Sequence, residues 1–137
     1  MSAFSNYLED AITAWINGTT FPTAPANVYL ALYNNSPSDA GNSGTELTTI
    51  LTGSANRVGI AANQWTRVTG GTASITNTNA ITITATAAGN ATATHFGVFD
   101  AQTAGNLLFH GALTASKTIT TGDEIKFNAA SLTLNID

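Results

Sequence analysis

Cysteine is absent from the sequence, and charged residues are few. Without cysteine the chain can form neither disulfide bonds nor thiolate metal sites, and it has no thiol nucleophile. Only 9% of its residues are charged, whereas soluble domains have about 25%. A surface with so little charge suits a protein that is permanently bound to a partner.

Basic residues and long apolar runs are scarce as well. Lys and Arg number 4 against 8 Asp and Glu, which gives a formal net charge of −4. Binding of nucleic acid requires a basic surface that neutralises phosphates. No apolar run approaches the roughly 20 residues that a membrane-spanning helix needs, and the N-terminus lacks the pattern of a signal peptide. We therefore expect neither nucleic acid nor a membrane among the partners.

The strongest local pattern predicts a β-hairpin over residues 94–113. Two runs of aromatic and branched residues, 96–99 and 107–109, flank a polar loop that contains glycine. The side chain of Asp100 can fold back on the loop backbone, and Gly105-Asn106 tolerate positive φ. Because these runs form the densest apolar cluster in the sequence, we expect the hairpin at the centre of the main sheet.

Apolar residues at helical spacing predict an α-helix over about residues 4–17. Ser5 can cap its start and Gly18 its end. Trp15 lies on the apolar face of this helix, so we expect it in the core. A connector with two prolines, residues 20–26, follows and separates the helix from the first long strand.

Residues 27–33 alternate between an aliphatic face and a face with Tyr29 and Tyr33, which is the pattern of a strand. We expect the aromatic face to be covered by the helix or by a partner. The polar segment 34–44 that follows has the composition of a long loop, and loops near this length are usually functional or mobile. This segment is therefore a candidate contact arm.

Shorter strands with turn signals between them complete the chain. They are predicted at residues 45–52, 57–60, 64–68, 73–76, 80–85, 116–120, 124–127 and 131–136. Such closely spaced strands indicate a mainly β fold, an antiparallel β-sandwich or jelly-roll-like barrel with one N-terminal α-helix. By length the chain is a single domain, residues 1–137, with the helix at about 4–17 and the sandwich at about 27–137.

The sequence contains no recognisable catalytic or metal-binding pattern. If the hairpin pairs Phe99 with Leu107, strand alternation places His95 and His110 on opposite faces of the sheet, which argues against a shared metal. The acidic residues lack the spacing of a calcium loop. Nucleophile-elbow, phosphate-loop and zinc motifs are missing. We expect no catalytic residue, no metal and no cofactor, and therefore no enzyme.

An alternative of another class is a carbohydrate-binding module. Aromatic faces pack on sugar rings, and the many Asn and Thr residues could bind hydroxyl groups. The candidates for such a platform are Trp15, Tyr29, Tyr33 and Trp65. The position of Trp15 on the apolar helix face favours a place in the core instead, and the same interpretation applies to Trp65.

Motifs spread over nearly the whole chain resemble a family of small virion proteins of tailed phages. They are Asn6-Tyr7-Leu8-Glu9, Pro25 to Leu32, Pro37 to Gly41 with Gly44-Thr45-Glu46, His95 to Asp100 with Gly105 to Gly111, and Gly122 to Asn128. Residues 48–93 match least. Members of this family carry the label tail fibre protein, and small β-sandwich proteins of this size also serve as cement or decoration proteins on phage heads.

The resemblance implies a non-enzymatic structural protein of the virion, made in the cytoplasm of a bacterial host. A fibre needs length from repeats or an intertwined shaft, and this sequence has neither, so we expect a cement or decoration protein on the outer capsid surface. It would bind the major capsid protein and stabilise capsomer boundaries. The alternative is a small tail, neck or tail-fibre-associated protein that binds tail or neck proteins. Such subunits sit on local two-fold or three-fold axes, so a homodimer or homotrimer is expected.

The residues that we expect at contacts with neighbours lie in the contact arm, on the aromatic face of strand 27–33 and near the N-terminus. They are Ser36, Pro37, Ser38 and Asp39 in the arm, Tyr29 and Tyr33 if the helix leaves them exposed, and Phe4. Strand faces rich in threonine and poor in charge would add surface for self-association.

Overall fold

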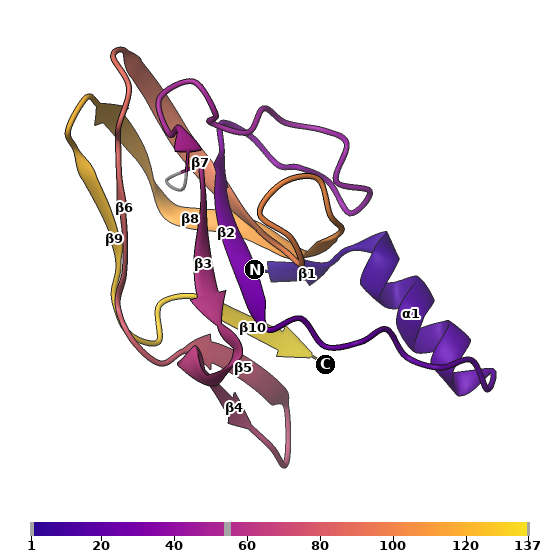
Figure 1. The fold of residues 1–137 in the computed structure, drawn as a ribbon. Helices are drawn as coiled ribbons and strands as arrows, with labels where there is room; N and C mark the ends of the chain where they lie inside the picture. The colour runs from indigo at the N-terminus through magenta and orange to yellow at the C-terminus, as the bar shows by residue number, and fades with distance from the viewer. Residues whose placement is uncertain (1, 54–55, 137) are drawn as a thin grey trace.

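The computed structural model describes residues 2–53 and 56–136 (Figure 1). Met1, residues 54–55 and Asp137, which the predicted domain 1–137 includes, lie outside the described residues. Within the described part the fold is mainly β, with antiparallel sheets in a sandwich-like arrangement and one α-helix near the N-terminus. The predicted fold class is therefore confirmed.

Strands far outnumber helices among the described residues. The helices are α1 (Asn6–Ile16) and a 3-10 helix, η2 (Ala62–Gln64). The strands are β1 (Ser2–Phe4), β2 (Asn27–Tyr33), β3 (Arg57–Ala61), β4 (Trp65–Val68), β5 (Ala73–Asn77), β6 (Ile81–Thr84), β7 (Asn90–Phe99), β8 (Leu107–Thr120), β9 (Glu124–Phe127) and β10 (Thr133–Ile136).

The strands form three antiparallel sheets around one main core. A five-stranded sheet has the order β1-β8-β7-β2-β3, a three-stranded sheet has the order β10-β5-β4, and β6 pairs with β9. Side chains from all three sheets meet in the main core. Its most enclosed members include Leu30, Leu32, Ile83, Ile119 and Leu132. The aliphatic face of β2 is thus buried, as the alternation of strand 27–33 predicted.

The predicted central hairpin is confirmed as β7 and β8, which lie between β2 and β1 in the five-stranded sheet. Its loop has the predicted chemistry. The Oδ1 atom of Asp100 accepts a hydrogen bond from the backbone N–H of Asn106 at 2.7 Å, and Gly105 has a φ of 73°. Strand β8 runs without a break over 14 residues, whereas the sequence predicted two shorter strands.

A β-bulge changes the register inside this hairpin. Phe99 pairs with Leu107 as predicted, but Val98 pairs with Phe109, so Leu108 is an extra residue in β8. Leu108 packs against the main core together with Phe109. Residues Phe109 to Ala112 are therefore displaced by one position from the register that simple alternation predicts, and a second irregularity between Ala93 and His95 displaces the rest of β8 further.

The segment 45–52 is not the predicted strand. Its one β-type backbone pairing is an isolated bridge between Glu46 and Tyr33. Leu47, Ile50 and Leu51 are all buried in the main core, and the N–H of Leu51 donates to the carbonyl of Leu47. The prediction was wrong because these apolar residues have the three- and four-residue spacing of a helical turn, not the two-residue period of a strand.

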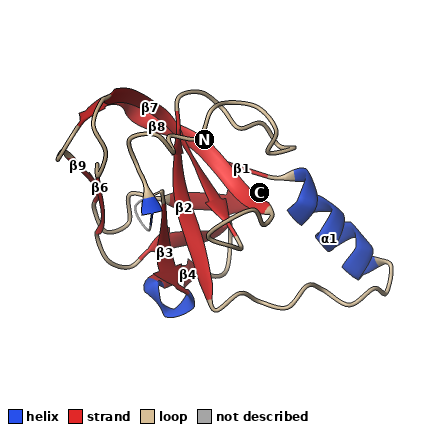
Figure 2. Cartoon of the chain, turned by 45° about the horizontal axis from the view of Figure 1, so that its top comes forward, coloured by secondary structure: helices blue, strands red, loops and turns tan. Residues whose placement is uncertain are grey.

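Helix α1 has the predicted caps but less contact with the body than predicted. The Oγ atom of Ser5 accepts from the N–H of Leu8, and Gly18 has a φ of 88°. Trp15, however, is 61% exposed and Ile16 is 74% exposed, so the expected core position of Trp15 is wrong. Figure 2 shows the helix standing away from the strands. In the described part of the chain, no helix has the length and apolarity needed to cross a membrane.

Candidate assembly interface

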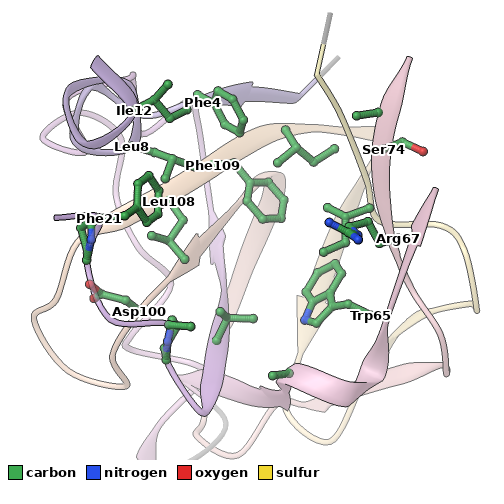
Figure 3. Close-up of a pocket in the computed structure, with 18 of the residues that line it drawn as sticks. Phe4, Leu8, Ile12, Phe21, Trp65, Arg67, Ser74, Asp100, Leu108 and Phe109 are labelled. Atoms are coloured by element: carbon green, nitrogen blue, oxygen red, sulfur yellow. The ribbon is translucent and has the colours of Figure 1, made fainter. Parts of the chain in front are cut away.

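An apolar cleft of about 620 Å³ opens between helix α1 and the three-stranded sheet (Figure 3). One wall is formed by α1 and by the connector, residues 20–26. The other wall is formed by β4 and β5, and Leu108 and Phe109 of β8 lie between the two walls. The cleft therefore opens on the side of the five-stranded sheet that faces the main core.

The helical wall presents a continuous apolar surface. Leu8 and Ile12 are one turn apart on α1, and both line the cleft with Phe4 of β1. Phe21 of the connector completes this wall and is 43% exposed. Phe4, Leu8 and Ile12 are half-buried, and an apolar surface that stays open to solvent in this way marks a contact surface.

The start of the helix is firmly attached to the strands. The backbone N–H of Ser5 donates to the carbonyl of Leu108 at 3.0 Å, and its hydroxyl donates to the carbonyl of Leu107. The N–H of Asn6 donates to the carbonyl of Asp39 at 2.9 Å. These bonds hold the first turn, so the orientation of α1 is set at its N-terminal end.

The sheet wall of the cleft continues an aromatic row that begins in the core. The ring of Phe109 meets Phe96 edge to face at 6.3 Å and meets Trp65 edge to face at 6.1 Å. The indole N–H of Trp65 is buried and finds no acceptor among the described residues. Val68, at the end of β4, is 49% exposed at the rim.

Charged groups are sparse in the cleft. Among the described residues that line it, the charged ones are Arg67 and Asp100. Both carboxylate oxygens of Asp100 accept hydrogen bonds from Asn106, at 2.7 and 2.8 Å, so this side chain closes its own loop. Within the described residues no three His, Asp or Glu side chains gather as a metal site would require. The lining is suited to contact with another apolar surface.

The opposite face of the five-stranded sheet is covered by a clamp cluster, which consists of Tyr33, Glu46, Arg57 and Phe99. The guanidinium of Arg57 donates to both carboxylate oxygens of Glu46, at 2.8 and 2.9 Å. It also donates to the carbonyls of Ala101 and Ala104 in the β7–β8 loop. Tyr33 stacks on Phe99 with ring centroids 6.5 Å apart. The chain's own loops therefore cover the aromatic face that we expected the helix or a partner to cover.

Burial changes the proton affinities in the clamp cluster. Burial, and then the negative charge of Glu46, raise the pKa of Tyr33 to about 12. For Arg57, burial disfavours the charged form, but the hydrogen bonds and charge of Glu46 outweigh it and raise the pKa above its ordinary value. Arg57 and Glu46 therefore form a largely buried ion pair.

The predicted contact arm, residues 34–44, is folded back on the sheet. Pro37 is fully enclosed, and its carbonyl accepts from the N–H of Ser43 at 3.0 Å. The Oδ1 atom of Asp39 lies 2.9 Å from Nε2 of His110. The arm is thus closed on itself and bonded to β8, so it is not a free extension.

The predicted interface residues differ in how far they are exposed to solvent. Tyr33 and Pro37 are buried and offer little surface to a partner. Asp39 is exposed, whereas Ser36, Ser38 and Tyr29 are half-buried. Phe4 is half-buried and is the member of this set that lines the cleft. A contact role for these residues stays a prediction.

The two histidines lie on the same face of the five-stranded sheet, contrary to the prediction. The bulge in β8 pairs His95 with Ala112 and His110 with Gly97, and cross-strand partners share a face. The Nδ1 atom of His95 lies 2.8 Å from the hydroxyl of Thr94. Each histidine thus has a hydrogen-bond neighbour of its own, Thr94 for His95 and Asp39 for His110.

The four aromatic residues proposed as a sugar platform are separated. Tyr29 and Tyr33 lie on the clamp side of the five-stranded sheet, and Trp65 lies on the core side. Trp15 is exposed on the helix and is not part of the cleft lining. Glycan binding by such a platform therefore has no support from their positions.

Sequence reasoning missed the cleft. Two signals for it were present in the sequence. Phe21 stands in a proline-rich connector, where a large aromatic residue has no strand or helix to pack with. The apolar stripe of the helix also continues through Trp15 and Ile16 to its last turn, beyond the part that Leu8 and Ile12 bring against the body.

Comparison with known families defines the class to which the chain belongs. It is a phage virion structural protein, as the resemblance of its motifs implied. More particularly, residues 3–135 match the Gp80 family, whose description is podophage GP4 fiber I protein gp80, and the chain belongs to this family. A search of the curated proteins finds none that matches it.

Proposed function

We propose that this chain is a non-enzymatic structural subunit of the fibre apparatus of a phage, and that the apolar cleft is an assembly contact. The family match over residues 3–135, with its description as a fibre protein, carries the proposal. The cleft supports it, because a lining of apolar side chains with two charged residues is suited to permanent contact with protein. The proposal places the protein in the tail or neck region, where tail or neck proteins would be its partners.

The fold limits the part that the chain would have in a fibre. A shaft obtains its length from repeats or from intertwined chains, whereas the described residues form one sandwich around one main core. We therefore assign it to a joint or an end of the fibre and not to the shaft. The proposal includes a homo-oligomer and no contact with nucleic acid or membrane.

A cement or decoration role on the outer capsid surface is the second candidate. The compact sandwich and the closed arm at residues 34–44 favour it, because a cement subunit needs a rigid body that can lie across capsomer boundaries. Its partner would be the major capsid protein, and a specific contact would bury about 1,000 Å² or more. The family description favours the fibre role over this one.

The location of the protein on intact particles distinguishes the two roles. A gold-labelled antibody against this chain would be imaged by negative-stain microscopy, with an antibody against the major capsid protein as a control for head labelling. We expect gold at the tail, neck or fibres. Even label over the head would replace the fibre role with the cement role, and particles without label would overturn both.

A further inference from the structure

We propose that a second copy of this chain completes the cleft, and that the helix tip of each copy, Trp15 and Ile16, is seated in the cleft of the other. This inference deepens the proposed function by naming the occupant of the assembly contact. It rests on two apolar surfaces of the same chain that do not contact each other. Each copy has an apolar cleft and an apolar helix tip, but the tip does not line its own cleft.

The helix tip continues the same apolar stripe that lines the cleft. Ile16 is four residues after Ile12, and Trp15 is seven residues after Leu8, so both stay on the face that Leu8 and Ile12 define. Leu8 and Ile12 face the cleft in Figure 3. The stripe is thus half-buried at its start and exposed at its end, where Trp15 is 61% and Ile16 is 74% exposed.

The attachment of the helix makes the tip a rigid projection. Ser5 and Asn6 bond the first turn to Leu107, Leu108 and Asp39, and the helix continues from this anchor for 11 residues. The backbone of the tip therefore needs little ordering when a partner binds. Contacts that are already ordered lose less entropy on association.

The charges near these surfaces are complementary between copies. The first 26 residues contain two charged side chains, Glu9 and Asp10, and both are acidic. Glu9 is next to the apolar stripe, and the basic residue in the cleft lining is Arg67. Among the described residues, neither Glu9 nor Arg67 has an ion-pair partner. If the helix of a second copy lies across the cleft, its Glu9 comes close to Arg67 of the first copy.

The position of the tip favours a closed two-fold dimer. Helix α1 is itself a wall of the cleft, and the tip is the turn of this helix that follows the lining residue Ile12. When two copies face each other about a two-fold axis, each tip meets the other's cleft, and both clefts close at once. Phe21 and Val68, exposed at the rim, would be covered in the same contact.

Sedimentation of the purified full chain over a range of concentrations tests this dimer. We expect a monomer–dimer equilibrium for the wild type. In the Trp15→Ser/Ile16→Ser variant the dissociation constant should rise about 30-fold or more, as for central interface residues. The matched control is Thr13→Ala, which changes an exposed residue of the same helix outside the stripe. Circular dichroism confirms that each variant is folded.

Exchange of charge tests the direct contact between copies. Glu9→Arg and Arg67→Glu should each weaken the homodimer. An equimolar mixture of these two variants should form heterodimers, because both cross-copy pairs are then of opposite charge. Native mass spectrometry separates heterodimers from homodimers by mass. A mixture that remains without heterodimers would contradict the assigned contact.

Two outcomes would overturn the inference as a whole. One is a wild-type chain that stays monomeric up to its solubility limit, which would leave the cleft to a different virion protein. The other is a dimer that the Trp15→Ser/Ile16→Ser variant forms as tightly as the wild type does. Neither result bears on the location of the protein in the virion, which the antibody experiment decides separately.

Discussion

The guanidinium carbon of Arg57 lies 3.7 Å from the centroid of the Phe99 ring. This contact is a cation–π interaction, and it adds to the hydrogen bonds that Arg57 donates to Glu46 and to the loop carbonyls of Ala101 and Ala104. One side chain therefore joins β3, the 45–52 turn and the β7–β8 loop. The clamp cluster stabilises the side of the molecule that lies opposite the cleft.

Replacement of Arg57 by Met should lower the free energy of unfolding by about 3 kcal/mol, because Glu46 would remain largely buried without its partner. Urea denaturation would measure the change. Lys126→Met is the matched control, since Lys126 is exposed and lies outside the cleft, and its effect should stay within about 0.5 kcal/mol. An equal effect of the two replacements would show that the cluster adds no stability.

Alkaline pH should destabilise the protein through Tyr33. Its pKa is raised from an ordinary value of 10.0 to about 12 in the folded chain. A raised pKa means that the folded state holds the proton more tightly, so this contribution is complete below pH 10 and is lost as the pH rises to about 12. Tyr33→Phe should lose this part of the pH dependence of unfolding. Tyrosinate absorbance should lack its step near pH 12 in the same variant.

Loss of the Ser5 hydroxyl should loosen helix α1 from the strands. Ser5→Ala removes the cap on the N–H of Leu8 and the bond to the carbonyl of Leu107, at a cost of about 1–2 kcal/mol. Thermal unfolding followed by far-ultraviolet circular dichroism would measure it. The control is Thr13→Ala, which removes an exposed helical hydroxyl that bonds to the carbonyl of Asp10. Equal stability of the two variants would contradict the anchor.

Alanine at Gly105 should disrupt the loop of the central hairpin. Its φ of 73° disfavours any side chain, and a Cβ atom would lie 2.5 Å from Oδ1 of Asp100. Gly70 has a φ of 88° but open space around it, so Gly70→Ala isolates the backbone cost, which is about 1–2 kcal/mol. Chemical denaturation should find Gly105→Ala less stable than Gly70→Ala. The reverse order would contradict the close approach.

The sequence predicted those parts of the fold that depend on local chemistry. Asp100 and Gly105 identified the hairpin loop because turn residues act on their own backbone. Ser5 and Gly18 identified the ends of the helix for the same reason. The bulge at Leu108 was missed, since three apolar residues in a row give no sign of which one is extra.

The candidate site depended on tertiary packing and was harder to predict. The stripe of α1 indicated an apolar face, but amphipathic spacing does not tell how far along the helix the body reaches, and this error placed Trp15 in the core. The burial of Arg57 was equally hidden, because its partner Glu46 lies in a separate turn. Composition identified the arm at 34–44 as a loop and could not show that it folds back.

The anchor of the helix also determines when the chain becomes ready to assemble. The carbonyl that holds the Ser5 hydroxyl belongs to a residue 102 positions later, so the helix cannot be positioned during synthesis until the central hairpin has emerged and folded. A growing chain therefore lacks an oriented helix tip. Unfinished chains would therefore stay out of the particle, because the helix tip becomes oriented only after the central hairpin has folded.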